Sequence, residues 1–235
     1  NFGQAVALAA KNLGVTAYVV MPENAPSVKK EAVKGYGAIV TECESTLEAR
    51  EKTSEKIQQE TGASFLHPSN NLDVILGNAT AGVELLEKHP DLDYLLVPVG
   101  GGGLIAGTVL AAKYFGHNCK VIGGEPFAVD DAYRALQSGK IELNESTNTV
   151  ADGLRTHLGD KNFPIIQELV SEIIRVEEEE IVAAMKHIWQ RMKIIIEPSS
   201  AVPFAAVLRE KEKFRDKKVG IILSGGNVDV TKLPF

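Results

Sequence analysis

The strand-like segments of this 235-residue chain are unbroken apolar runs, and each is followed by a segment with helical periodicity. The clearest example is the run Tyr94–Val99, which precedes a helical pattern over Leu104–Phe115. Strands that are apolar on both faces are typical of parallel sheets covered by helices on both sides, because a sheet face in water would require alternating polar residues. The sequence therefore predicts an α/β fold with doubly wound, mostly parallel sheets.

A polar stretch at residues 67–71, HPSNN, divides this alternating pattern. We interpret it as the boundary between a small domain at residues 1–70 and a large domain at residues 71–235. The first segment, residues 1–14, has the pattern of a helix with no strand before it, although a helix of an α/β domain normally follows a strand. We therefore expect the chain to begin inside a domain, so that both domains are incomplete.

Composition and charge argue against several classes of function. The net charge of −6 and the pI near 5.5 disfavour a nucleic-acid partner, which usually requires a basic face. No run approaches the roughly 20 apolar residues of a membrane span. Cys43 and Cys119 have no zinc-binding spacing, so we expect two thiols in a reducing compartment, the cytoplasm.

Four consecutive glycines, Gly100–Gly103, lie between the strand and the helix of the segment LLVPVGGGGLIAGTVLAA. Each glycine loses more conformational entropy on folding than another residue would, so the run needs a physical reason. In parallel sheets, ligands bind where strands lead into helices, and bare N–H groups at the start of a helix attract phosphate. We interpret the run as an anion site. The alternative is a closely packed turn, for which a single glycine would suffice.

One candidate for the phosphate group is a dinucleotide. Gly101, Gly103 and Ala106 match the pattern G-x-G-x-x-A, and Glu125 ends the next strand about 20 residues later, as in nicotinamide-dependent dehydrogenases. A second glycine turn, LSGGN at residues 223–227, also follows a buried strand. A dinucleotide would explain only the first turn and would leave the serine and asparagine of the second without a function. A compact cofactor with a phosphate at one end and a heteroaromatic nitrogen at the other would use both turns.

Six segments of the chain together resemble one enzyme family. They are NFGQA, VPVGGGGLIAG, GGEPFAVDDAY, VADGL, IIEPSSAV and LSGGNVD, and they occur in the family's order along essentially the whole chain. The family is that of the pyridoxal-phosphate-dependent serine racemases and threonine or serine dehydratases, which have fold type II, the tryptophan synthase β-like fold. Several motifs in register are more specific than any one of them.

The resemblance implies a pyridoxal-phosphate site. Gly100–Gly103 would form the phosphate cup, and Asn1 would hydrogen-bond the ring hydroxyl. Gly153 and Glu197 would border the ring, and Ser224 would face the pyridine nitrogen. A neutral hydroxyl cannot hold a full positive charge there as a carboxylate would, which suits racemisation and β-elimination of hydroxy amino acids. Without the resemblance, Ser224 would be interpreted as a turn residue that caps the glycines.

The resemblance also implies a divalent-cation site made of Glu125, Asp131 and the backbone carbonyl of Val129. Oxygen ligands of this kind suit Mg²⁺, Ca²⁺ or Mn²⁺, with water completing the shell. The residues alone favour a different interpretation, in which Asp130 or Asp131 caps the helix that starts there. Glu125 is also the residue that the dinucleotide hypothesis assigns to a ribose.

Other matches concern the substrate and an effector. Arg50 and Thr156 match positions that approach the small amino-acid substrate in serine racemases, although Arg50 alone would be interpreted as a solvated helix charge. Lys29 and Tyr36 match the region of a nucleotide-effector site at the dimer interface, so the resemblance implies a homodimer. A polar helix face is the alternative interpretation of these two residues.

Several positions depart from the family pattern. The Schiff-base lysine and the serine that acts on the opposite face of the substrate both belong upstream of Asn1, and no residue of the chain matches either. Phe2 stands where the family has a histidine beside the substrate carboxylate, and an apolar ring cannot donate that hydrogen bond. Ser69 stands where serine racemases have a cofactor-contacting asparagine.

These observations lead to three hypotheses for the function. The first is a pyridoxal-phosphate enzyme that racemises serine, threonine or a similar hydroxy amino acid, or converts it to an oxo acid and ammonia. The second is a nicotinamide-dependent dehydrogenase that uses the G-x-G-x-x-A turn. The third is a non-catalytic relative of the same fold that lacks the lysine.

Overall fold

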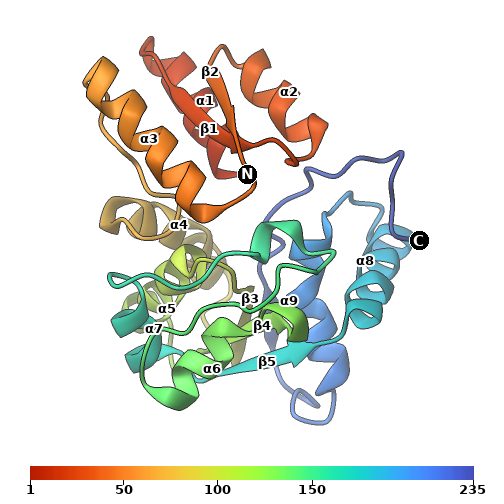
Figure 1. Cartoon of the computed structure of the whole chain (residues 1–235). Coiled ribbons are helices and arrows are strands. Elements are labelled where there is room, and N and C mark those ends of the chain that lie inside the picture. The colour runs from red at the N-terminus through yellow and green to blue at the C-terminus, as the bar shows by residue number, and fades with distance from the viewer. The chain divides into compact units, whose positions relative to one another are not determined.

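The computed structural model describes residues 1–235, and the chain forms two compact units (Figure 1). The small unit contains Asn1–Leu66 together with Asn227–Leu233, and the large unit contains His67–Gly226 together with Pro234–Phe235. Residues near the C-terminus therefore return to the unit that contains the N-terminus. Each unit is built around its own parallel sheet.

The small unit has a two-stranded parallel sheet and three helices. Its elements are α1 (Phe2–Leu13), β1 (Tyr18–Pro22), α2 (Ser27–Gly35), β2 (Ile39–Cys43) and α3 (Leu47–Thr61). The core joins Ala7 of α1, Val19 of β1 and Val33 of α2. A Cβ atom at Gly3 would lie 3.0 Å from Val19 Cγ1, so α1 packs closely on the sheet. Asn227 Nδ2 donates to Asn1 Oδ1 at 2.6 Å, which ties the returning segment to this unit.

The large unit has a four-stranded parallel sheet in the order β5-β4-β3-β6. Its elements are α4 (Leu72–Lys88), β3 (Tyr94–Pro98), α5 (Gly103–Phe115), β4 (Lys120–Pro126), the 3₁₀ turn η1 (Phe127–Val129), α6 (Asp131–Ser138), the 3₁₀ turn η2 (Asp152–Leu154), α7 (Phe163–Leu169), β5 (Glu172–Val176), α8 (Glu178–Met192), α9 (Pro198–Arg209) and β6 (Val219–Ile221). Strand β3 lies inside the sheet, and its residues Leu95, Leu96 and Val97 are all fully buried. This burial on both faces explains why the sequence of the strand is an unbroken apolar run.

Helices cover both faces of this sheet. Gly123 and Gly124 are neighbours in β4, so their substituents point to opposite faces. A Cβ atom at Gly123 would lie 3.1 Å from Ile105 Cδ1 of α5, whereas one at Gly124 would lie 3.1 Å from Pro203 Cα of α9. Helices α5 and α9 therefore cover opposite faces, and the prediction of a doubly wound parallel sheet is confirmed.

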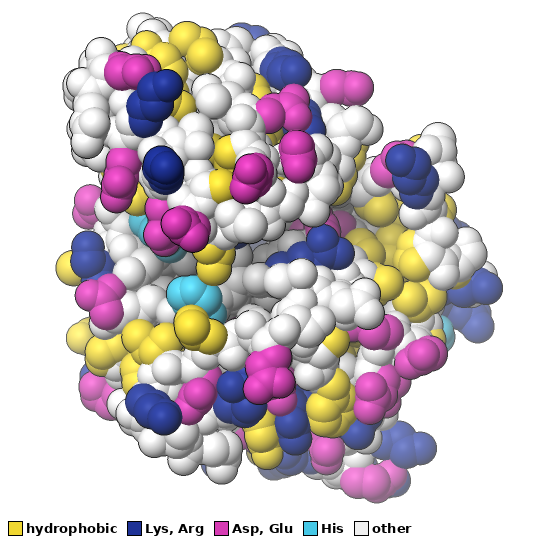
Figure 2. Space-filling model, viewed as in Figure 1, with side chains coloured by type: hydrophobic (Ala, Val, Ile, Leu, Met, Phe, Trp, Pro, Cys, Tyr) yellow, Lys and Arg dark blue, Asp and Glu magenta, His cyan; other side chains and the backbone are white.

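Acidic and basic side chains are mixed on the face drawn in Figure 2. None of the helices combines the length and the apolar character that a membrane span requires. Cys43 and Cys119 are free thiols, as the sequence predicts. Burial raises the pKa of the Cys119 thiol to about 11, so this thiol stays protonated and weakly nucleophilic at neutral pH.

Candidate active site

The four-glycine turn follows the carboxyl end of β3 and leads directly into α5. Gly102 is the residue before the helix and has a left-handed backbone with φ 81°, a conformation that glycine adopts without a steric penalty. The first N–H groups of an α-helix have no acceptor within the helix, and the helix dipole adds partial positive charge at this end. The turn therefore presents backbone donors suited to an anion.

Every glycine of the turn is also closely packed. A Cβ atom at Gly100 would lie 2.9 Å from Leu154 Cα, and one at Gly103 would lie 2.8 Å from Ser69 Cα. At Gly101 it would lie 2.9 Å from Ser69 Cβ, and at Gly102 it would lie 2.7 Å from Leu158 Cδ2. The packed-turn alternative therefore explains all four positions and not just one. The two explanations are compatible, because packing on one side leaves the N–H groups free to act on the other.

The second glycine turn is held by the start of α9. Ser200 Oγ donates to the carbonyl of Gly225 and accepts from its N–H, each at 2.7 Å. The same oxygen lies 3.2 Å from Ser224 Oγ. Because Ser200 uses its own proton on Gly225, the proton in the contact between the two serines comes from Ser224. Glu197 adds a backbone hydrogen bond to the carbonyl of Gly225, at 3.1 Å.

Gly153 connects the two turns within the large unit. Its N–H donates to Ser199 Oγ at 3.0 Å, and its carbonyl oxygen would lie 3.0 Å from a Cβ atom at Gly100. A Cβ atom at Gly153 would lie 3.8 Å from Glu197 Oε1, and that carboxylate is buried. The structure therefore brings together Gly100, Gly153, Glu197 and Ser224, which lie up to 124 positions apart in the sequence.

The substrate and effector residues fall in different parts of the chain. Thr156 lies beside the glycine turn, with its Oγ1 atom 3.1 Å from the Cβ position of Gly101. Arg50 lies on α3 of the small unit, where its Nε donates to the carbonyl of Thr46 at 3.4 Å. Lys29 and Tyr36 belong to α2 and its C-terminal end, also in the small unit. The roles of Arg50, of Lys29 and Tyr36, and of Asn1 stay predictions.

Glu125 is fully buried at the end of β4 and caps helix α6. Its Oε1 accepts from the N–H of Ala132 at 3.0 Å, and its Oε2 accepts from the N–H of Tyr133 at 2.9 Å. Asp130 is the residue before this helix, as expected, but its side chain makes no capping hydrogen bond. A carboxylate arriving from the preceding strand already occupies the N–H groups of Ala132 and Tyr133. The assignment of Glu125 to a ribose is wrong as well, because the side chain is fully buried and a ribose cannot reach it. Each of its oxygens keeps a second lone pair for a small ion.

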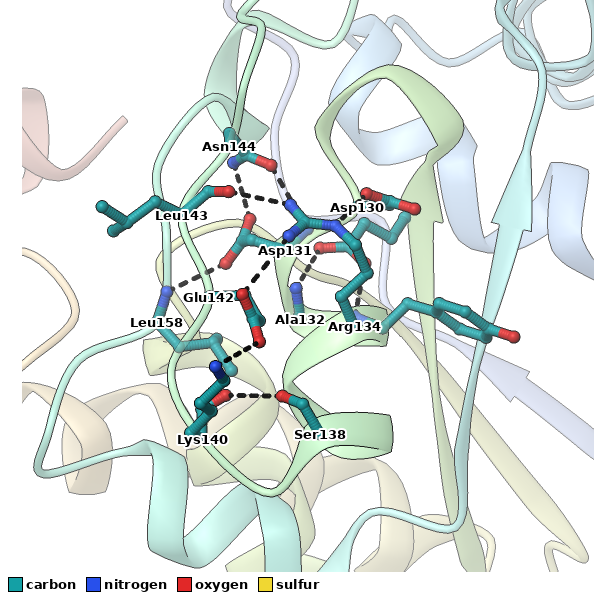
Figure 3. A network of polar contacts seen from close by, with 12 residues as sticks. Asp130, Asp131, Ala132, Arg134, Ser138, Lys140, Glu142, Leu143, Asn144 and Leu158 are labelled. Atoms are coloured by element: carbon teal, nitrogen blue, oxygen red, sulfur yellow. Dashed lines mark hydrogen bonds and ion pairs between the residues drawn. The ribbon is translucent and has the colours of Figure 1, made fainter.

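Asp131 is a second buried carboxylate, and its charge acts on Glu125. Figure 3 shows Asp131 with its partners Asn144 and Leu158. Its Oδ1 accepts from Asn144 Nδ2 at 2.6 Å, and its Oδ2 accepts from the N–H of Leu158 at 3.1 Å. Burial raises the pKa of Asp131 to about 6. Burial, reinforced by the neighbouring charge of Asp131, holds the pKa of Glu125 well above its usual range. The two acids therefore favour a cation or protons between them.

Asp130 has the opposite environment. Its two oxygens pair with Arg134 Nε at 2.7 Å and Arg175 Nη1 at 2.8 Å, and these hydrogen bonds lower the pKa of Asp130 although burial raises it. The guanidinium of Arg175 lies over the rings of Phe127 and Tyr133, with its Cζ 4.5 and 3.8 Å from their centroids. Asp130 is thus neutralised by arginine, which leaves Asp131 as the aspartate available to a metal.

Sequence reasoning missed three residues that shape this region. Ser200 is part of the EPSS motif, but its two hydrogen bonds with the backbone of Gly225 could not be predicted from the sequence. Asn144 lies in a polar connection without periodicity, and Asn162 has the pattern of an ordinary residue before a helix. Asn162 is fully buried and donates to the carbonyl of Gly101 at 2.8 Å.

Comparison with known proteins identifies the family. Residues 1–225 match the sequence model of the family described as "Pyridoxal-phosphate dependent enzyme". The chain is 50% identical to serine racemase of Dictyostelium discoideum, covering 99% of this chain and 73% of the relative. It is 44% identical to β-hydroxyaspartate dehydratase of Paracoccus denitrificans, covering 100% and 75% of the two chains.

Solved structures agree with the sequence relatives. The crystal structure of Dictyostelium discoideum serine racemase superposes with a TM-score of 0.89 at 51% identity, over 97% of this chain and 74% of that one. The crystal structure of a T.th. threonine deaminase superposes with a TM-score of 0.92 at 42% identity, over 98% and 76%. With its doubly wound parallel sheet and its two glycine turns, this chain belongs to the family of pyridoxal-phosphate-dependent enzymes of fold type II.

Proposed function

We propose that this protein racemises a small hydroxy amino acid, or eliminates water from it, with pyridoxal phosphate as cofactor. The observation that carries the proposal is the joining of the two glycine turns through Gly153 and the serines at the start of α9. A ligand with two chemically different ends uses both turns. The relatives support this class of reaction, because they include a serine racemase, a β-hydroxyaspartate dehydratase and a threonine deaminase.

The residues present fit the phosphate end of this cofactor. The N–H groups at the start of α5 need acceptors, and a phosphate dianion supplies several. The hydroxyl groups of Ser69 and Thr156 both lie beside Gly101, where they add polar contacts to the same turn. The absence of side chains at Gly100–Gly103 lets Ser69, Leu154 and Leu158 pack directly against this backbone.

The residues also fit the ring end. When bound, pyridoxal phosphate supplies an electron sink that makes the bonds at the Cα atom of an amino acid easier to break. In this structure the single hydroxyl proton of Ser224 is directed to Ser200 Oγ. Rotation of the Ser224 hydroxyl would redirect this proton to the ring nitrogen when the cofactor is bound. A neutral donor shares this proton without fixing a full positive charge on the ring. Gly153 and Glu197, which lie near each other, would border the ring and orient it.

Proton transfer at the substrate needs groups on both faces. We propose that the lysine carrying the cofactor, and the serine on the opposite face, lie N-terminal to Asn1 in the full-length protein, as the family pattern implies. Thr156 and Arg50 are the proposed substrate contacts from this chain.

Borohydride reduction of the holoenzyme, followed by peptide mass mapping, is expected to place a phosphopyridoxyl adduct on a lysine N-terminal to Asn1. An adduct on a lysine of residues 1–235, or none at all, would refute this assignment.

The reaction itself is tested with a panel of hydroxy amino acids. We expect the holoenzyme to act on at least one of L-serine, L-threonine and β-hydroxyaspartate, forming the D-enantiomer or an oxo acid with ammonia. Chiral chromatography and oxo-acid detection separate the two outcomes. Removal of the cofactor should abolish both activities, and its return should restore them. A fully loaded enzyme that leaves all three substrates unchanged would support the non-catalytic alternative instead.

We also propose a divalent-cation site held by Glu125, Asp131 and the carbonyl of Val129. The donor set consists of oxygen atoms, and the raised pKa values of the two buried acids show that a positive charge would stabilise their ionised forms. Residues 1–235 contain no group of three acidic, histidine or cysteine side chains placed so that they could hold a metal ion by themselves. A backbone carbonyl and water would therefore complete the shell, and the cation would brace the loop between β4 and α6.

Binding of Mg²⁺ is expected to weaken as the pH falls through about 6, where Asp131 takes up a proton. Without a cation, the raised pKa of Asp131 means that stability falls as the pH rises from about 4 to about 6. At pH 7.5, Mg²⁺ at 100 times its Kd should stabilise the protein by about 2.7 kcal/mol, and at pH 5 by much less. Urea unfolding with and without Mg²⁺ measures both effects.

Two variants of neighbouring aspartates control this experiment. Asp131→Asn should remove the Mg²⁺ effect at both pH values. Asp130→Asn should keep it, because Asp130 is paired with Arg134 and Arg175. Stabilisation that survives in Asp131→Asn but is lost in Asp130→Asn would place the cation elsewhere.

The family resemblance supports three further proposals. The protein would form a homodimer, a nucleotide effector would bind near Lys29 and Tyr36, and the enzyme would work in the cytoplasm. Analytical ultracentrifugation with and without ATP tests the first two.

A further inference from the structure

Asn162 is a fully buried amide that joins three segments of the large unit. Its Nδ2 donates to the carbonyl of Ser69 at 3.0 Å and to the carbonyl of Gly101 at 2.8 Å. Its Oδ1 accepts from the N–H of Gly159 at 3.0 Å. Both donors and one acceptor site of the amide are therefore used, and one of the donors acts on the glycine turn itself.

The hydrogen bond to Gly101 determines which way the next N–H points. A trans peptide is planar, and its C=O and N–H groups point in opposite directions. Because the carbonyl of Gly101 points toward Asn162, the N–H of Gly102 points away from Asn162. That N–H belongs to the residue before α5, among the donors that the helix leaves without acceptors. Asn162 therefore orients a donor of the candidate phosphate site without being part of it.

Side chains pack closely around this peptide on the side of Asn162. A Cβ atom at Gly102 would lie 2.8 Å from Asn162 Oδ1, 2.7 Å from Leu158 Cδ2 and 2.9 Å from Ile166 Cδ1. The side of the turn that faces Asn162 is thus filled and apolar apart from the amide. Without Asn162, the carbonyl of Gly101 would be left without this donor among apolar neighbours, and the peptide would no longer be held in one orientation.

We infer that Asn162 is a positioning residue for the cofactor's phosphate, because it holds the Gly101–Gly102 peptide with its N–H toward the anion. This inference rests on the proposed pyridoxal-phosphate site. A positioning role for Asn162 differs from a purely structural role in one measurable respect. A structural role affects every ligand of the folded protein equally, whereas a positioning role affects those ligands that carry a phosphate.

The test compares pyridoxal phosphate with pyridoxal, which has the same ring and no phosphate. Both affinities are measured by absorbance titration of the protein after the cofactor has been removed. Asn162→Ala is expected to lower the affinity for pyridoxal phosphate roughly tenfold, as loss of one oriented hydrogen bond to a charged group implies, and to leave the affinity for pyridoxal unchanged. Stabilisation by inorganic phosphate, measured as a shift in Tm, should decrease in parallel.

Asn70 provides the matched control. It joins the same two loops, donating to Asp160 Oδ1 at 2.7 Å and accepting from the N–H of Lys161 at 2.9 Å, but it has no hydrogen bond to the glycine turn. Asn70→Ala should leave the ratio of the two affinities unchanged. If Asn162→Ala does not fold, Asn162→Ser retains one donor and should give an intermediate ratio.

The outcomes separate this inference from the proposed function. A wild-type protein that binds the two compounds equally would overturn the phosphate site itself. A wild-type preference for pyridoxal phosphate that persists in both Asn162 variants, or that falls equally in Asn70→Ala, would overturn the role of Asn162 alone.

Discussion

Replacing Gly102 with alanine is expected to lower the affinity for pyridoxal phosphate by at least roughly 100-fold, the loss of about two charge-assisted hydrogen bonds. Gly102 has φ 81°, where a Cβ atom is strained, and the added atom would meet Leu158, Asn162 and Ile166 within 2.9 Å. Relief of both strains requires the turn to move, and the N–H groups at the start of α5 move with it. The free energy of unfolding should also fall by about 2–4 kcal/mol.

Gly139→Ala is the control for this experiment. Gly139 has a similar left-handed backbone with φ 75°, but an added Cβ atom would meet only Gln167 Nε2, at 3.6 Å. It should therefore lose about 1 kcal/mol of stability and keep its affinity for the cofactor. Absorbance titration and urea unfolding measure both properties. Normal cofactor affinity in Gly102→Ala would show that the turn does not hold the phosphate.

Ser224→Ala is expected to lower the turnover number roughly 10- to 100-fold, because a hydrogen bond to a group that gains charge is worth about 1.5–3 kcal/mol. Affinity for the substrate should change less, since Ser224 is proposed to act on the ring nitrogen. Steady-state kinetics with the preferred substrate separates kcat from KM.

Ser224→Thr keeps the hydroxyl and tests the same claim in the opposite direction. Ser224 is exposed in the structure, so the extra methyl group has room. Most of the activity should therefore return in this variant. An alanine variant as active as the wild type would assign Ser224 to the turn alone, which is its interpretation without the family resemblance.

The sequence was sufficient to predict those features that depend on local pattern. Unbroken strands such as β3 predicted a sheet covered on both faces, and the contacts of Gly123 with α5 and of Gly124 with α9 show why. The glycine turn after β3 was also predictable, because its four glycines are consecutive in the sequence. Its close packing at all four positions was not foreseen, since the packing partners come from residues 69 and 154–166.

Contacts between distant residues account for the features that were missed or wrong. Helix α6 was expected to be capped by Asp130 or Asp131, the residues at its start, but Glu125 reaches it from the preceding strand. The burial of Glu125 also removes the acidic residue that the dinucleotide hypothesis assigned to a ribose. Asn162 acts on Gly101, 61 positions earlier in the chain, and no local pattern predicts such a pair.

The central claim is that Gly100–Gly103 and Ser224 hold opposite ends of one molecule of pyridoxal phosphate. A crystal structure of the holoenzyme tests it most directly. We expect the phosphate oxygens within hydrogen-bond distance of the N–H groups at the start of α5, and the ring nitrogen within hydrogen-bond distance of Ser224 Oγ. A phosphate bound away from the glycine turn, or a ring nitrogen facing a different residue, would contradict this account.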